Sequence, residues 1–201
     1  MTCGSLRTTL SIPDAEAPQS RLPSLLVFLG NPGPSYARSR HNLGWLLCDR
    51  LSFSASLAWR ERYKGLFAQR GSLLLLKPQT SMNRSGESVR PCASFHRLAA
   101  GLILVVHDDL ELPFGAFELK RGGGLGGHNG LRDIKRALSS ADFQRLRLGV
   151  GRPARGAAAA FLLSRFSPQE EAVLCAFLDR AAAALESYLE GAGFDILPMI
   201  R

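Results

Sequence analysis

The sequence predicts a single α/β domain with a mixed, mostly parallel central sheet covered by helices on both faces. Short apolar segments typical of buried strands alternate with segments of helical periodicity over most of the chain. No internal repeat or linker divides the chain. The 201 residues, 46% of them hydrophobic, are enough for one sizeable core. No uncharged apolar run reaches the roughly 18 to 20 residues of a membrane span, which excludes a transmembrane protein.

Six segments have the apolar or alternating pattern of strands. The most apolar of them is 102–107, and 117–120 alternates apolar and polar residues before a glycine-rich loop at 122–127. The full set of expected strands is 25–29, 59–69, 72–77, 102–107, 117–120 and 143–150. Because helices separate several of these strands, most of the sheet is expected to be parallel.

Four segments have the three- and four-residue apolar spacing of helices. Ser167 as cap and Pro168 at the first helical position form a clear start signal for the longest of them. Pro91 is expected to kink or shorten the second. The expected helices are 41–57, 82–98, 128–138 and 168–189.

Residues 1–22 differ in composition from the rest of the chain. They are rich in Ser, Thr and Pro and lack the apolar core of a secretory signal, so we expect a disordered N-terminal extension ahead of a folded domain at 23–201. Arg7, with no acidic residue before Asp14, also fits an organellar transit peptide. The four cysteines include no CxxC pair and favour a reducing compartment. The expected location is therefore cytoplasmic or mitochondrial.

The charge balance favours an anionic partner. Lys plus Arg number 25 against 17 Asp plus Glu, a net charge of +8, and only four of the cations are lysine. Arginine is suited to forked acceptors such as phosphate. Compositional bias without a polyanionic partner is the alternative interpretation.

Four polar clusters each follow an expected strand, where loops of α/β sheets carry functional residues. A histidine beside an aspartate is typical of a general base, and asparagines can orient water or a carbonyl. His96, between Phe95 and Leu98, is expected to be structural. Each cluster alone could be a turn, a helix cap or a solvated loop, but four on one sheet favour one site. The clusters are Asn31-Pro32-Gly33 with Arg40-His41-Asn42, Met82-Asn83, His107-Asp108-Asp109, and Gly122–Gly127 with His128-Asn129-Gly130.

Two other kinds of site have partial support. Gly122, Gly124 and Gly127 match G-x-G-x-x-G, but Asp142 precedes the next strand, whereas a dinucleotide site has its acid at the end of that strand. A metal site could draw on the His107-Asp108-Asp109 cluster and His128, but no pair has the i, i+4 spacing of zincins. No G-x-S-x-G elbow or Walker A loop is present.

Five separated motifs, in order from Leu25 to Phe166, closely resemble the bacterial-type peptidyl-tRNA hydrolase family. The resemblance implies a single α/β catalytic domain that cleaves the ester between a peptide, or another N-blocked aminoacyl group, and the 3′ end of tRNA. It also implies that neither metal nor cofactor is used, and that the protein is a monomer that recycles tRNA in ribosome rescue and associates with the ribosome. The motifs are Leu29–Gly33 with Tyr36 and Arg40-His41-Asn42, Lys77–Asn83 with Ser85-Gly86, His107–Leu110 with Leu112-Pro113 and Gly115, Gly122–Leu131, and Arg145–Pro153.

The same resemblance implies roles for individual residues. His41 is expected to be the general base that activates water, and Asp108 the carboxylate that orients and polarises it. Asn31 is expected to act with them in catalysis. The residues expected to bind the peptide, the terminal nucleotide or tRNA phosphates are Tyr36, Asn83, Asn129, His128, Lys120 and Arg147.

The chain departs from the family pattern at Asp109, where glutamate is commoner, and at Leu125, where histidine is common. Neither position belongs to the expected catalytic set. Two other functions remain open: an RNA-binding module without turnover, and a dinucleotide-dependent oxidoreductase.

Overall fold

The structure is a computed structural model, and it describes residues 22–153, 155 and 157–192. Seven strands form one sheet in the order β2-β3-β4-β1-β5-β7-β6. The four inner strands β4, β1, β5 and β7 are parallel, and β2, β3 and β6 run antiparallel to their neighbours. The strands are β1 Leu25–Phe28, β2 Arg60–Arg62, β3 Gly65–Arg70, β4 Leu73–Pro78, β5 Ile103–Asp109, β6 Phe117–Arg121 and β7 Gln144–Gly149.

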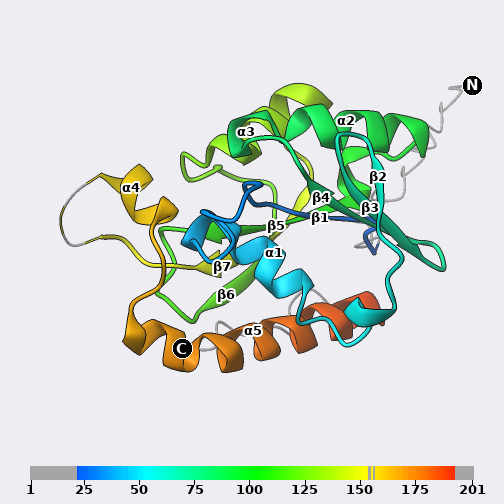
Figure 1. Cartoon of the computed structure of the whole chain (residues 1–201). Helices are drawn as coiled ribbons and strands as arrows, with labels where there is room; N and C mark the ends of the chain where they lie inside the picture. The colour runs from blue at the N-terminus through cyan, green and yellow to red at the C-terminus, as the bar shows by residue number, and fades with distance from the viewer. Residues whose placement is uncertain (1–21, 154, 156, 193–201) are drawn as a thin grey trace, which may run out of the picture.

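Helices cover both faces of this sheet (Figure 1). On one face α1 (Leu43–Cys48) and α5 (Pro168–Leu189) pack with Leu26, Phe28 and other residues on that side of the strands. On the other face α2 (Gly86–Phe95) and α3 (Asn129–Leu138) pack against the alternate residues, such as Val27 and Val105. The predicted fold class, a mixed and mostly parallel sheet between two helical layers, is therefore confirmed. None of the helices in the described ranges is both long and apolar enough to cross a membrane.

Most of the expected elements are present with boundaries shifted by one or two residues. The helix at 168–189 is confirmed in full, and it begins with a capping box in which Ser167 accepts from the Glu170 N–H and Glu170 accepts from the Ser167 N–H. Of the expected N-terminal extension, residues 1–21 lie outside the described residues.

The helix predicted over 41–57 is wrong beyond Cys48. A 3₁₀ turn at Arg40–Asn42 leads into α1, and after α1 the chain forms turns and a second 3₁₀ helix at Ser54–Ser56. In this segment the Ser54 hydroxyl donates to the Asp49 carbonyl oxygen at 3.1 Å. Serine side chains that bond to nearby carbonyls compete with helix hydrogen bonds, which leucine spacing alone does not reveal.

Two further predictions need correction, and one helix was missed. Residues 59–69 are not one strand but the β2–β3 hairpin, whose turn residues Tyr63 and Lys64 both have positive φ without being glycine. The helix expected over 82–98 is a 3₁₀ turn at Met82–Arg84 followed by α2, which continues past Pro91 because one lost hydrogen bond does not end it. The short helix α4 (Ala158–Leu163) was not predicted.

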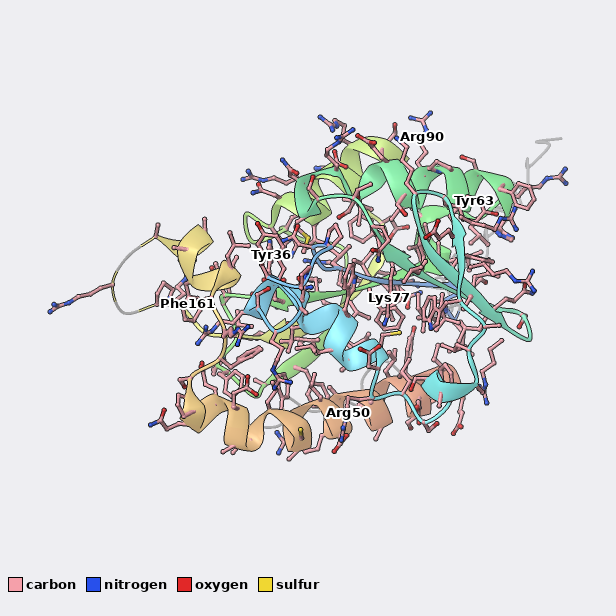
Figure 2. The ribbon with its side chains drawn as sticks, viewed as in Figure 1. Tyr36, Arg50, Tyr63, Lys77, Arg90 and Phe161 are labelled. Carbon is pink, nitrogen blue, oxygen red and sulfur yellow. The ribbon has the colours of Figure 1, made fainter. Side chains whose placement is uncertain are left out.

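A buried arginine joins α4 and α5 to the segment that precedes α1. Arg40 is 5% exposed and donates to Glu170 Oε2 at 2.5 Å and to Ser164 Oγ at 2.7 Å. Its guanidinium carbon lies 4.1 Å from the ring centre of Phe161 on α4. Phe161 and Tyr36 lie at the same end of the molecule (Figure 2). Arg40 therefore fixes its neighbour in sequence, His41, against this end of the sheet.

At Gly44, α1 approaches the ends of the strands so closely that a side chain has no room. A Cβ atom on Gly44 would lie 2.6 Å from the Leu29 carbonyl oxygen and 2.8 Å from that of Val106. Alanine normally stabilises a helix interior relative to glycine by about 0.5 to 1 kcal/mol. We expect the reverse for Gly44→Ala: a loss of about 1 to 3 kcal/mol in the free energy of unfolding, measured by chemical denaturation.

Gly101→Ala is the matched control, since its added Cβ would lie 3.7 Å from its nearest neighbours, at ordinary contact distance. If both variants unfold at the same denaturant concentration, the close approach of α1 to the strand ends does not constrain this position.

Candidate active site

The Asp108 carboxylate lies at the carboxyl end of the central strand β5 and is 2% exposed. Its Oδ1 accepts hydrogen bonds from two histidines, Nδ1 of His41 at 2.9 Å and Nε2 of His128 at 3.2 Å. Burial alone would raise the pKa of the Asp108 carboxyl, but the two histidines and their hydrogen bonds outweigh it and hold the pKa below its ordinary value. Asp108 is therefore an anion buried between two imidazole rings.

The backbone fixes the tautomer of His128. His128 is the N-cap of α3, and its Nδ1 accepts from the N–H groups of Gly130 at 3.1 Å and Leu131 at 3.4 Å. Because a backbone N–H can only donate, Nδ1 carries the lone pair and the ring proton is on Nε2. His128 therefore donates to Asp108 as a neutral imidazole.

His41 has the opposite arrangement. Its Nδ1 faces the Asp108 carboxylate and donates to it, so the lone pair of the neutral ring is on Nε2. The ring is largely buried, with 9% of the residue exposed, and its centre lies 5.1 Å from that of His128. A carboxylate on Nδ1 both orients the imidazole and stabilises the imidazolium that forms when Nε2 takes a proton.

Asn42 holds Asn31 beside this pair, a role that the sequence did not reveal. The Asn42 side chain accepts from the Asn31 N–H at 2.8 Å and donates to the Asn31 carbonyl oxygen at 2.9 Å. In turn, Asn31 Oδ1 accepts from the Met82 N–H at 2.8 Å. With its oxygen used, the Asn31 side chain presents its amide N–H₂ as a donor. The available signal was that Asn42 is a polar residue inside the Arg40-His41-Asn42 cluster.

A cavity of about 150 Å³ opens beside the histidines. It contains the expected residues His41, Asp108, His128 and Asn129, together with part of the glycine-rich loop and of α4. Its lining is His41, Asp108, Asp109, Leu110, Leu125, Gly126, Gly127, His128, Asn129, Ala158, Ala159 and Leu162. A larger hollow of about 520 Å³ lies at the other end of the sheet, but its lining, which includes Arg70 and Glu186, holds no comparable histidine–carboxylate cluster.

The other expected site residues are not part of the lining of this cavity; they are Asn31, Tyr36, Asn83, Lys120 and Arg147. Tyr36 is 37% exposed, and exposed Asn83 accepts a hydrogen bond from the Ser81 hydroxyl at 2.9 Å. Lys120 on β6 has no ion-pair partner among the described residues. Arg147 on β7 is already engaged: its Nε donates to Asp109 at 2.7 Å, and it also pairs with Glu118. Any phosphate at Arg147 would share that guanidinium with two carboxylates.

His107 faces the interior behind Asp108. Its Nδ1 donates to the Asp108 carbonyl oxygen at 2.8 Å, and its ring packs edge-on against His128. Burial, reinforced by the neighbouring His128, lowers the pKa of His107 to about 3, so the ring is neutral at physiological pH.

The geometry argues against both alternative kinds of site, a metal site and a dinucleotide site. Possible ligand atoms of His41, Asp108 and His128 lie within 4.8 Å of one another. As arranged, however, both histidines donate to Asp108, and a metal on Nε2 of His128 would have to displace its proton. The glycine-rich loop follows β6, which is antiparallel to β7, whereas a dinucleotide fingerprint belongs to a parallel βαβ unit.

A mixed sheet with a parallel core, and with a histidine–aspartate pair beside a cavity at the carboxyl edge of that core, is the arrangement of an α/β enzyme. A profile of the family described as Peptidyl-tRNA hydrolase matches residues 25–196. The chain belongs to this family, as its sequence motifs predicted.

Individual relatives are similar over most of their length. The peptidyl-tRNA hydrolase of Geobacter metallireducens is 49% identical over 162 residues, which are 77% of this chain and 82% of that protein. The peptidyl-tRNA hydrolase of Treponema pallidum is 51% identical over 157 residues, 74% of this chain and 78% of that protein. A crystal structure of peptidyl-tRNA hydrolase from Acinetobacter baumannii matches with a TM-score of 0.78 at 34% identity, covering 87% of this chain and 92% of that one.

The two bonding roles of His128 can be separated by substitution. Asparagine can replace the N-cap acceptor but is too short to reach Asp108, whereas alanine supplies neither contact. We expect His128→Asn and His128→Ala to lower kcat alike, roughly tenfold or more. His128→Asn should remain more stable than His128→Ala by about 1 kcal/mol, measured by thermal unfolding. Equal stability of the two variants would contradict the assignment of the lone pair to Nδ1.

Proposed function

We propose that this protein hydrolyses the ester that joins a peptide, or another N-blocked aminoacyl group, to the 3′ end of tRNA, with His41 activating water. The observation that carries the proposal is the bond from His41 Nδ1 to the buried Asp108 carboxylate, which leaves Nε2 as the basic atom beside the cavity. An RNA-binding module needs no such pair, and this favours turnover over binding alone.

The reaction needs a positioned water and one proton acceptor. His41 Nε2 takes a proton from water as the oxygen attacks the ester carbonyl, and Asp108 stabilises the imidazolium that results. The tetrahedral intermediate then collapses, and His41 returns the proton to the departing ribose oxygen. Both steps use the same histidine, so no covalent intermediate is required.

Asparagines supply the neutral donors that this chemistry requires. Asn31, whose Oδ1 is held by the Met82 N–H, directs its amide N–H₂ to the water or to the developing oxyanion. Asn129 lines the cavity at the first turn of α3, and Asn83 lies on the 3₁₀ turn that follows β4. We assign these two to the terminal nucleotide and the peptide, Tyr36 to the outer wall of the site, and His128 to the acceptor end as well as to Asp108.

The remaining assignments concern the contacts with tRNA, the oligomeric state and the place where the protein acts. Lys120 contacts phosphates of the acceptor stem, and Arg147 contributes charge at its edge while paired with Asp109 and Glu118. The protein acts as a monomer, in the cytoplasm or in mitochondria, and recycles tRNA in ribosome rescue through contact with the ribosome. The net charge of +8 supports an RNA partner.

Replacement of His41 tests the mechanism. His41→Asn keeps a polar side chain near Asp108 but removes the basic nitrogen. We expect kcat for hydrolysis of N-acetyl-aminoacyl-tRNA to fall by on the order of 10²-fold or more, with KM nearly unchanged, because a general base acts in the transition state. His96→Asn, which changes a histidine packed on Phe67, is the control and should keep wild-type kcat. An equal rise in KM and fall in kcat for His41→Asn would mark His41 as a binding residue.

Removal of divalent ions tests the expectation that no metal is used. Since both histidines donate to Asp108, we expect dialysis against EDTA to leave kcat within about twofold. The assay is repeated after addition of Zn²⁺ or Mn²⁺. Loss of activity on chelation that either ion restores would show that His41, Asp108 and His128 hold a metal.

A further inference from the structure

The glycine-rich loop at 122–127 is held from below by a buried arginine that none of the assigned roles uses. Arg145 on β7 is 2% exposed, and its Nη1 donates to the Gly124 carbonyl oxygen at 2.9 Å. Its Nη2 donates to the Gly122 carbonyl oxygen. No carboxylate pairs with Arg145 among the described residues; its two Nη atoms bond to loop carbonyls, and its buried Nε has no partner there.

The loop could not hold this shape without its glycines. Gly122, Gly123, Gly126 and Gly127 all have positive φ, between +57° and +77°. A segment with so much backbone freedom adopts one conformation only if something fixes it, because glycine loses the most entropy on ordering. The forked guanidinium of Arg145 can hold two carbonyls at once.

The orientation of these carbonyls determines where the loop directs its N–H groups. All peptide bonds in the described chain are trans, so each C=O and the N–H of the following residue point in opposite directions. With the Gly122 and Gly124 carbonyls turned toward Arg145, the N–H groups of Gly123 and Leu125 turn away from it. Neither N–H has a hydrogen-bond partner among the described residues.

Lys120 stands next to these donors. Lys120 and Arg145 are paired across β6 and β7. A Cβ atom on Gly123 would lie 3.4 Å from Cε of Lys120 and 3.8 Å from Nη2 of Arg145. The same loop continues into Gly126 and Gly127, which line the cavity beside the histidines. Of the two donors, that of Gly123 therefore lies beside Lys120, and that of Leu125 belongs to a residue that lines the cavity.

We propose that Arg145 is a positioning residue that turns the loop so that the N–H groups of Gly123 and Leu125, together with Lys120, bind a phosphate of the tRNA acceptor end. Unbonded backbone N–H groups beside a cation can bind an anion, and such binding needs no base sequence. Arg145 itself does not touch the phosphate. The inference rests on the proposed function, since it names how that substrate is held.

Arg145→Met tests this assignment, because methionine fills similar space and cannot hold the carbonyls. We expect KM for full-length N-acetyl-aminoacyl-tRNA to rise about tenfold, which corresponds to about 1.4 kcal/mol of lost binding, with kcat within twofold. N-acetyl-aminoacyl-adenosine, which lacks the stem, should be hydrolysed with unchanged kcat/KM. Arg145→Lys, which can hold one carbonyl, should give an intermediate KM. Arg70→Met, the same charge change at the other end of the sheet, should leave both substrates unaffected.

A double substitution shows whether Arg145 and Lys120 serve one site. If Arg145 positions the loop donors of the same phosphate site that Lys120 serves, Lys120→Ala with Arg145→Met should raise KM by less than the product of the single effects. A multiplicative effect, or an unchanged KM in Arg145→Met, would overturn the proposal. So would equal losses on both substrates, which would mean that Arg145 supports the fold or the chemistry. If Arg145→Met does not fold, Arg145→Lys takes its place in the test: a raised KM for the tRNA substrate supports the proposal, and an unchanged KM overturns it. A wild-type protein that hydrolyses neither substrate would instead refute the proposed function.

Discussion

The buried Asp108 carboxylate is the constraint on which the arrangement of this site depends. An ionised carboxylate at 2% exposure is costly unless it is hydrogen-bonded; here Oδ1 takes both hydrogen bonds, and the buried Oδ2 has no partner among the described residues. To supply them, the chain must bring the segment before α1 and the start of α3 to the end of β5. The close approach of Gly44 to the strand ends and the cap at His128 are the local conditions that allow this. The requirement to satisfy one anion thus joins three segments distant in sequence.

The two histidines bonded to Asp108 differ in their ability to accept a proton, because the other nitrogen of each ring has different partners. His128 has its Nδ1 occupied by backbone N–H groups, so it can donate but has no free lone pair for a substrate. His41 is bonded through Nδ1, and its Nε2 is free of protein partners among the described residues. Only His41 can therefore act as a base without disturbing the backbone. The difference arises because backbone N–H groups at the N-terminus of α3 occupy the lone pair of His128. It becomes visible only when the partners of both rings are compared.

The sequence predicted the parallel strands and the polar clusters that follow them, because both depend on local signals. Apolar runs fix the parallel strands, and a Ser-Pro start with Glu170 fixes α5. Other features depend on partners far along the chain. Asn42 gains its role only when Asn31 lies beside it, and Arg145 only when the glycine-rich loop lies over β7. The turn at Tyr63 and Lys64 was missed because residues without glycine's freedom are held at positive φ by the surrounding hairpin.

The structure also refines what the net charge of +8 means. Many arginines are neutralised within the protein and cannot contribute fully to an electrostatic surface; they include Arg38, Arg40, Arg50, Arg147 and Arg152. Arg145 lies below the surface and acts on the backbone instead. Near the cavity, the cations without an ion-pair partner among the described residues include Lys120, beside the glycine-rich loop, and Arg132 and Lys135, which line a hollow with Leu125 and Gly127. Under the proposed function, cations and fixed peptide dipoles suit a ligand whose backbone must be placed while its sequence varies, as an acceptor stem shared by many tRNAs requires.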